Sequence, residues 1–151
     1  MPVRIQPHAF DAGAELAALT QGRGDIGASV TFVGQMREFS DGTKLNAMTL
    51  EHYPAMAQAE LERIEMQARE RFDVTDLEII HRYGELHPGD PIVLVIATSK
   101  SRQPAFDAAS FIMDYLKTSA PFWKKESSPE GETWVDARKT DDDATARWQR
   151  D

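Results

Sequence analysis

The chain has 151 residues, of which 41% are hydrophobic and 28% are charged, and its net charge is −8. This size and composition are typical of one soluble globular domain over residues 1–151, and they exclude collagen-like, coiled-coil and wholly disordered chains. The acidic balance argues against nucleic acid or anionic membranes as partners, and no apolar stretch approaches the roughly 20 residues that cross a bilayer, so we expect a cytoplasmic protein.

Apolar periodicity and turn residues predict three helices, each followed by two strands. Because pairs of strands alternate with helices, we expect an α+β fold with a mixed, largely antiparallel sheet. In chain order, the predicted elements are a helix to about residue 20, strands over 28–35 and 45–53, a helix over 55–72, strands over 77–83 and 92–99, a helix over 103–119, and strands over 122–126 and 133–137.

Local signals support these boundaries. Asp11 can cap the first helix, and Pro54 and Pro104 suit the first turns of the second and third helices. The Pro88-Gly89 pair favours a tight reversal, so the strands on either side of it should form a hairpin.

Two segments allow more than one structure. The polar residues 36–44, with the turn sequence Ser40-Asp41-Gly42, predict either a mobile loop or a wide hairpin connection. A charged tail begins at about residue 140, and its Trp148 either docks on the body or remains loose.

The residue inventory excludes several chemistries. Without cysteine the chain cannot form a disulfide, a thiolate zinc site, a catalytic thiol or a persulfide, so any sulfur chemistry needs sulfur from another molecule. The four histidines lack paired ligand spacing, and we expect no bound metal. Phosphate-loop, dinucleotide and serine-hydrolase motifs are also missing from the sequence.

One window reverses the acidic balance of the chain. Between Lys100 and Lys125 five basic side chains face two acidic ones, for a local charge of +3. This window indicates a small anionic ligand or an acidic partner surface. The alternative is an ordinary solvated helix face followed by a charged strand, with Lys117 favourably placed at a helix C-terminus.

The predicted geometry of this window separates its cations. A helix of about 17 residues has its ends roughly 25 Å apart, and Arg102 and Lys117 lie near opposite ends, which indicates either a site shared between subunits or two anion sites. In the following strand, Lys124 and Lys125 should point to opposite faces, with Lys124 on the face of Phe122.

Several sequence motifs stand out. The longest and most specific lie at 113–118 (MDYLKT) and 120–126 (APFWKKE), and supporting motifs lie at 31–37 (TFVGQMR), 50–54 (LEHYP) and 81–86 (HRYGEL). Together they resemble the large, catalytic subunits of molybdopterin synthase, the MoaE family. The matching segments run from about residue 27 to residue 148.

This resemblance implies an α/β hammerhead fold and a homodimer in which each subunit binds one small, ubiquitin-like subunit of the MoaD family. The small subunit's C-terminal Gly-Gly tail would carry sulfur as a thiocarboxylate. Two transfers to cyclic pyranopterin monophosphate (precursor Z) would form the dithiolene of molybdopterin, and no cofactor is implied. A cysteine-free chain and a basic window suit this chemistry, because the sulfur arrives on a partner and both substrates are anionic.

The resemblance also implies roles for individual residues. It assigns Lys117 to proton transfer or to stabilising a tetrahedral acyl intermediate, and Lys124 as the second catalytic lysine. Some of the residues would come from the neighbouring subunit. The implied substrate-binding and wall positions are Arg37, Ser101, Arg102, Lys125, Arg138, Phe32 and Met113.

The resemblance fails at one position. Ser101 stands where the family commonly has a histidine before Arg102. If that histidine is an essential acid or base, this chain should be slow or inactive; if it only binds substrate, the serine hydroxyl or Lys100 can replace it. Two alternatives therefore stay open: a non-catalytic relative that binds the small subunit as a regulatory or scaffold module, and a generic enzyme acting on a phosphate ligand.

Overall fold

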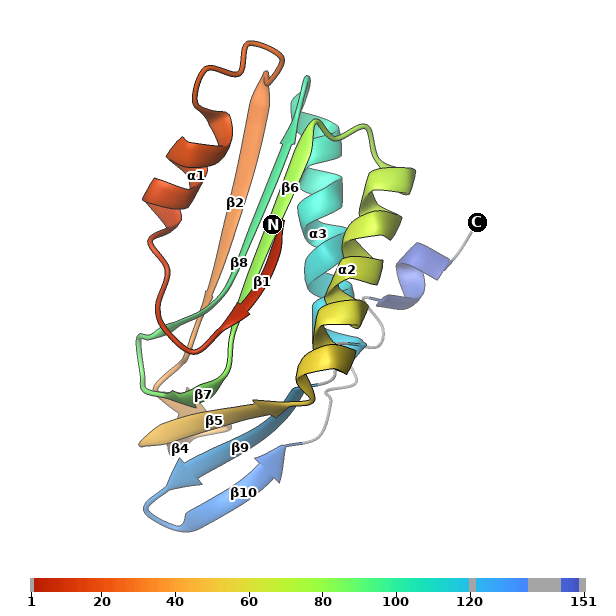
Figure 1. Ribbon diagram of the computed structural model, residues 1–151. Coiled ribbons are helices and arrows are strands. Elements are labelled where there is room, and N and C mark those ends of the chain that lie inside the picture. Colours follow the sequence, from red (N-terminus) through yellow and green to blue (C-terminus); the bar gives the residue numbers. More distant parts are fainter. Residues whose placement is uncertain (1, 120–121, 136–144, 150–151) are drawn as a thin grey trace.

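The computed structural model describes residues 2–119, 122–135 and 145–149, and within them the strands form two four-stranded sheets and one two-stranded hairpin (Figure 1). The main sheet is mixed: its first pair is parallel and the other two pairs are antiparallel. Its spatial order is β1 (Val3–Gln6), β6 (Asp76–Arg82), β8 (Pro91–Ser99) and β2 (Ala28–Gln35).

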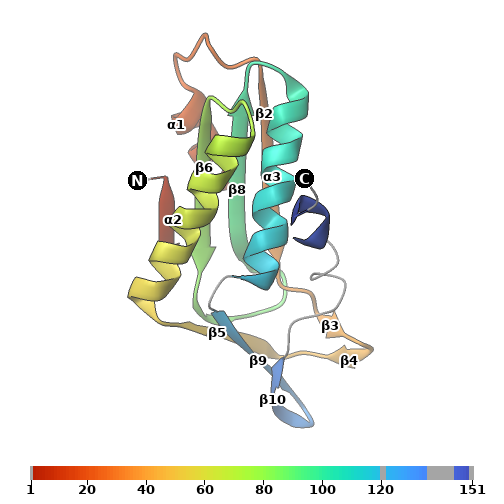
Figure 2. The same cartoon turned by 90° about the vertical axis from the view of Figure 1, so that its right-hand side faces the viewer.

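Helices cover both faces of the main sheet. On one face lie α2 (Pro54–Arg71) and α3 (Arg102–Thr118), and on the other lies the shorter α1 (Ala12–Thr20) (Figures 1 and 2). The central strand β8 is therefore buried on both sides and reads as a continuous apolar run. Alternate residues of β8 join the two cores: Val93 and Val95 pack with α2 and α3, and Leu94 and Ile96 pack with α1.

The second sheet is antiparallel throughout and crosses the end of the main sheet at which α3 ends (Figure 1). It has its own small core of Met36, Leu45, Met48, Leu50 and Leu86. Its spatial order is β10 (Gly131–Val135), β9 (Phe122–Ser128), β5 (Ala47–His52) and β7 (Gly84–Leu86).

The local signals of the sequence act as predicted. The Asp11 carboxylate accepts a hydrogen bond from the Ala14 N–H at 3.0 Å and caps α1, while Pro54 is the first residue of α2. Strands β6 and β8 are antiparallel neighbours, and Asp90 closes the turn before β8 by donating to the His87 carbonyl at 2.9 Å. The α+β class and the three α-helices are confirmed among the described residues.

The expectation of one sheet is wrong, because the strands divide between separate sheets, and two strands were missed. Strand β1 was not predicted; it is only four residues long and pairs in parallel with β6, with Val3 opposite Ile79. Strand β7 was also not predicted: Gly84 has a φ of +91°, which favours glycine, and turns the chain away from β6 toward β5. The segment between β6 and β8 therefore joins the two sheets.

The structure describes the first open segment and residues 145–149 of the second. Residues 36–44 contain a hairpin of β3 (Phe39–Ser40) and β4 (Thr43–Lys44), turned through Asp41 and Gly42, both at positive φ. The tail ends in a short 3₁₀ helix, η1 (Arg147–Gln149). Its Trp148 docks against α2 and α3, because its ring packs against Phe72 and Phe111. Among the described residues, no helix is long and apolar enough to span a bilayer.

Candidate functional site

A small pocket lies between the C-terminal turns of α3 and the main sheet. Its wall includes Phe32 and Gly34 of β2, His81 of β6, and Met113 and Lys117 of α3. Its volume is about 80 Å³, well below the roughly 300–1,000 Å³ of sites that enclose a drug-sized ligand. One chain therefore offers room for a narrow group and leaves a larger substrate outside.

Helical spacing and sheet geometry bring the wall together. Met113 and Lys117 are four residues apart and so lie on the same side of α3, and the C-terminal turn of a helix favours a cation such as Lys117. On β2, the register with β8 shifts between Gly34 and Gln35, a β-bulge at the pocket. A Cβ on Gly34 would lie 2.7 Å from Val93 Cγ1, so the wall here must be bare backbone.

His81 lines the pocket together with Lys117. Its imidazole is buried, and its Nδ1 lies 2.8 Å from the Arg82 carbonyl oxygen. Burial, and to a smaller extent the nearby positive charge of Lys117, lower the pKa of His81 to about 4, so the ring is neutral at pH 7. In the sequence, His81 is only the first residue of the 81–86 motif, and no local pattern indicates a role for it.

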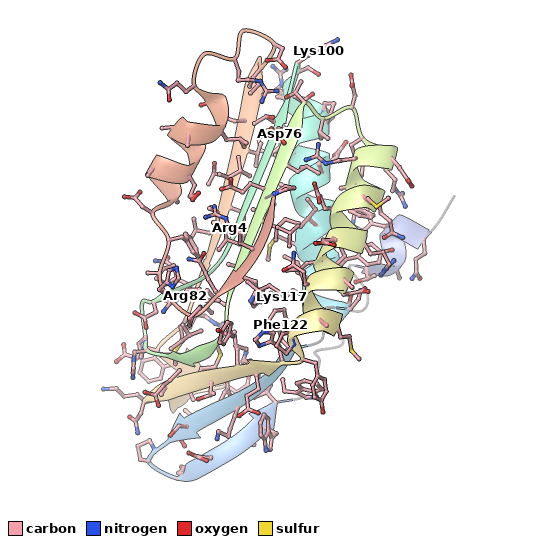
Figure 3. The ribbon with its side chains drawn as sticks, in the orientation of Figure 1. Arg4, Asp76, Arg82, Lys100, Lys117 and Phe122 are labelled. Carbon is pink, nitrogen blue, oxygen red and sulfur yellow. The ribbon has the colours of Figure 1, made fainter. Side chains whose placement is uncertain are left out.

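An aromatic stack connects this wall to the second sheet. Phe122 lies nearly parallel to the His81 ring at 4.0 Å between centroids, and on β9 it also stacks with His52 of β5 at 5.6 Å. Figure 3 shows Lys117 and Phe122 at the end of the main sheet that adjoins the second sheet, with Lys100 at the opposite end.

The two lysines of β9 diverge, as the strand period predicts. Lys124 shares a face with Phe122, the residue that contacts His81, and its Nζ lies 3.8 Å from Glu126. Lys125 lies on the other face, 3.5 Å from Glu132 and 5.6 Å from the ring centre of Trp134. Lys124 therefore lies on the face of β9 that carries Phe122 but does not line the pocket, and Lys125 lies on the opposite face of the strand.

A second basic site lies at the other end of α3. Ser101 and Arg102 are exposed and line a cavity of about 610 Å³ together with Gly27 and Lys100. Ser101 is the N-cap residue of α3, but its hydroxyl makes no capping hydrogen bond. Gly27 allows close packing here, because a Cβ would lie 2.1 Å from the Lys100 carbonyl oxygen.

The predicted site residues thus fall into separate groups. Phe32, Met113 and Lys117 share the small pocket, and the exposed Arg37 follows Gln35 of its wall by two residues. Ser101 and Arg102 lie at the far end of α3, as its length predicts. Arg138 lies outside the described residues. Within the described part of the chain, no group of three or more His, Asp or Glu residues could hold a metal ion.

Comparisons with known proteins agree on one family. The family described as MoaE protein matches residues 5–119. The molybdopterin synthase catalytic subunit of Mesorhizobium japonicum is 53% identical over 97% of this chain and 92% of its own, and that of Pseudomonas aeruginosa is 51% identical over 99% of both chains.

A solved structure extends the likeness to the fold. The molybdopterin biosynthesis MoaE protein from Burkholderia ambifaria superposes with a TM-score of 0.84 at 49% identity, covering 99% of this chain and 98% of that one. The specific motif at the end of α3 and the start of β9 is therefore part of a match that extends over almost the whole length. The chain belongs to the MoaE family, the family of molybdopterin synthase catalytic subunits.

Proposed function

We propose that this chain transfers sulfur from the C-terminal thiocarboxylate of a small, ubiquitin-like subunit of the MoaD family to precursor Z, and so forms the dithiolene of molybdopterin. The observation that carries the proposal is the narrow pocket that Lys117 lines, in a chain that belongs to the MoaE family. A cavity of about 80 Å³ suits an extended glycine tail, which has no side chains, better than it suits a pterin.

The charges of the site suit the proposed chemistry. The thiocarboxylate sulfur forms a bond to a substrate carbon as the carbon–oxygen bond at that carbon breaks and the oxygen group leaves with a proton. Water then cleaves the resulting thioester, leaving the tail as a carboxylate and the sulfur on the substrate as a thiolate. A negative charge develops on the acyl oxygen during cleavage, and the Lys117 ammonium can stabilise that charge or supply a proton. Lys124, on the face of β9 that carries Phe122, is the second catalytic lysine of the proposal.

Arginines suit the substrate phosphate, because the planar guanidinium can donate two parallel hydrogen bonds to phosphate oxygens. In the proposal, Arg37 binds from the rim of the pocket, and Ser101 and Arg102 bind from the far end of α3 of a second subunit. The pocket of one chain is too small to enclose the pterin, which supports a site completed by its homodimer partner. Arg138 and Lys125 stay predicted substrate-binding residues.

One observation favours a second candidate function. Because Ser101 cannot exchange a proton near neutral pH as a histidine can, the chain could instead bind the small subunit as a non-catalytic module. Both candidates predict a complex with the small subunit, so binding alone does not separate them.

Reconstitution separates the two. The purified chain is mixed with precursor Z and a thiocarboxylated small subunit, and molybdopterin is measured; the same small subunit ending in an ordinary carboxylate is the matched control. We expect product with the thiocarboxylate only. A stable complex that yields no product at any concentration would support the non-catalytic module.

A further inference from the structure

His81 is the one buried titratable group of the pocket that the proposed roles leave unused. It is 8% exposed, and its Nδ1 lies 2.8 Å from the Arg82 carbonyl oxygen. A carbonyl oxygen can only accept a hydrogen bond, so the ring proton resides on Nδ1 and Nε2 carries the lone pair. Among the described residues, no hydrogen bond reaches Nε2.

The surroundings hold this ring in one orientation and keep it neutral. Phe122 stacks on it with an interplanar angle of 12°, and the Arg82 carbonyl fixes the other edge. The titratable groups that face it are Lys117 from α3 and His52 from β5, and both disfavour a second proton on the ring. Phe32 of β2 and Ile92 of β8 complete the wall with apolar side chains.

The wall of the pocket therefore offers two different partners: a neutral acceptor on the buried His81 and a cationic donor on the exposed Lys117. A chain terminus carries the complementary pair, since the last peptide N–H is a donor and the terminal group one residue further on is an anion. The bare backbone at Gly34 and the small volume suit a last residue without a side chain.

We propose that His81 Nε2 accepts a hydrogen bond from the last peptide N–H of the small subunit's tail, while Lys117 faces the terminal thiocarboxylate. This inference rests on the proposed function and adds a tail-binding residue to it. His81 thereby fixes the tail at its final residue and sets the depth at which the acyl carbon meets Lys117. It makes His81 a determinant of specificity for a terminal glycine.

A double-mutant cycle on binding tests this contact without turnover. One partner change is His81→Asn, whose amide can still donate to the Arg82 carbonyl but no longer reaches the Nε2 position. The other replaces the last glycine of the small subunit with glycolate, which exchanges the N–H for an ester oxygen. Affinities of the four pairs are measured by calorimetry with the carboxylate form of the tail.

With wild-type His81, we expect the ester to weaken binding about three- to tenfold, the usual effect of one hydrogen bond. With His81→Asn, the ester should cause almost no further loss, because the acceptor is already absent. Equal losses in both backgrounds, or no loss with wild-type His81, would overturn the proposal.

Two further measurements keep the test decisive. Imidazole ¹⁵N NMR of the wild-type chain needs no substitution. The spectrum should show the proton on Nδ1 and a change in the Nε2 signal when the small subunit binds. An unchanged Nε2 signal contradicts the contact.

In the turnover assay, His81→Asn should raise the KM for the thiocarboxylated small subunit three- to tenfold. His81→Gln, with an amide oxygen near the Nε2 position, should recover part of this loss. A rise confined to the KM for precursor Z would contradict the proposal and show that His81 Nε2 accepts a hydrogen bond from the pterin and not from the tail.

These outcomes distinguish the inference from the function on which it rests. A wild-type chain that shows the coupled binding but forms no molybdopterin would refute the proposed function and leave the tail contact standing. A chain that forms molybdopterin but shows no coupling between His81 and the ester in the binding cycle would refute the tail contact and leave the proposed function standing.

Discussion

Arg102 and Lys117 lie in the first and last turns of α3, separated by about 22 Å of helix at 1.5 Å per residue. Each lies in a different cavity of the same chain, so one small ligand cannot touch both within one subunit. A second subunit can bring its own Arg102 to the Lys117 pocket if two copies associate with the proper symmetry.

Mixed dimers test this arrangement. With precursor Z well below its KM, Lys117→Ala and Arg102→Ala should each be nearly inactive. Unfolding and refolding them together should restore about one quarter of wild-type activity, since half of the dimers then hold one intact site. Lys117→Ala mixed with a chain carrying both substitutions is the matched control and should stay inactive. If the first mixture also stays inactive, the two residues do not form a shared site.

Removing the ammonium of Lys117 should abolish turnover with the fold intact. Because a positioned proton donor or acceptor is worth about 10²–10⁴-fold, we expect Lys117→Ala to lower kcat by that factor and to leave the unfolding midpoint almost unchanged. Lys44→Ala, an exposed lysine paired with Glu38, is the control and should keep normal kcat. A Lys117→Ala chain with more than about a tenth of the wild-type rate does not use this residue in the chemical step.

Ser101 makes no capping bond to α3, so its hydroxyl is available to a phosphate oxygen. If the position only binds substrate, Ser101→His should change KM by a few-fold and leave the pH–rate profile unchanged; this is the expected result. Steady-state kinetics between pH 5.5 and 8.5 measure both. A higher kcat with a new ionisation between about pH 6 and 7 would show that a histidine here takes part in proton transfer.

Burial of His81 should make the stability of the chain depend on pH. Its folded pKa of about 4 lies below that of an unfolded histidine, so the unfolded chain takes up the proton first as the pH falls. The free energy of unfolding should therefore decrease between about pH 6.5 and 4, by up to about 3 kcal/mol from this group. Burial also lowers the pKa of His52, so protonation of His52 should likewise decrease the free energy of unfolding as the pH falls.

Urea denaturation at several pH values measures this decrease. His81→Phe, which keeps a ring to stack on Phe122, should show a shallower loss of stability than wild type over this range, and His8→Phe at an exposed histidine should not. Parallel curves for wild type and His81→Phe would mean that His81 is protonated normally in the folded chain.

Trp148 should contribute to stability although it lies only three residues from the C-terminus. Its ring packs on Phe72 and Phe111, its Nε1 donates to the Asp114 carboxylate at 2.5 Å, and Arg71 donates to its carbonyl at 2.8 Å. We expect Trp148→Ala to lower the free energy of unfolding by about 1–3 kcal/mol, less than for a fully buried aromatic residue. Trp148→Phe keeps the ring contacts and should lose about 1 kcal/mol, the usual contribution of the missing hydrogen bond. An unchanged Trp148→Ala chain would show that the docked tail adds no stability.

The sequence by itself determined the elements whose causes are local. Asp11 bonds to a backbone N–H three residues away, and Pro54 sets its own backbone angle, so both helix starts were predictable. The strand period separated Lys124 from Lys125, and the length of α3 separated Arg102 from Lys117, because both depend only on repeat geometry. The motif around Lys117 was specific enough to indicate the family.

Only the tertiary structure decided which segments meet. Strand β1 pairs with a strand some seventy residues later in the chain. After β6 the chain leaves the main sheet, because Gly84 turns it so that β7 pairs with β5 in the second sheet. Neither pairing has a local signal in the sequence. The role of His81 was hidden for the same reason. Its neutral state and its free ring nitrogen arise from burial, from the Arg82 carbonyl and from the contact with Phe122 of another sheet, and such an environment exists only once distant segments have packed together.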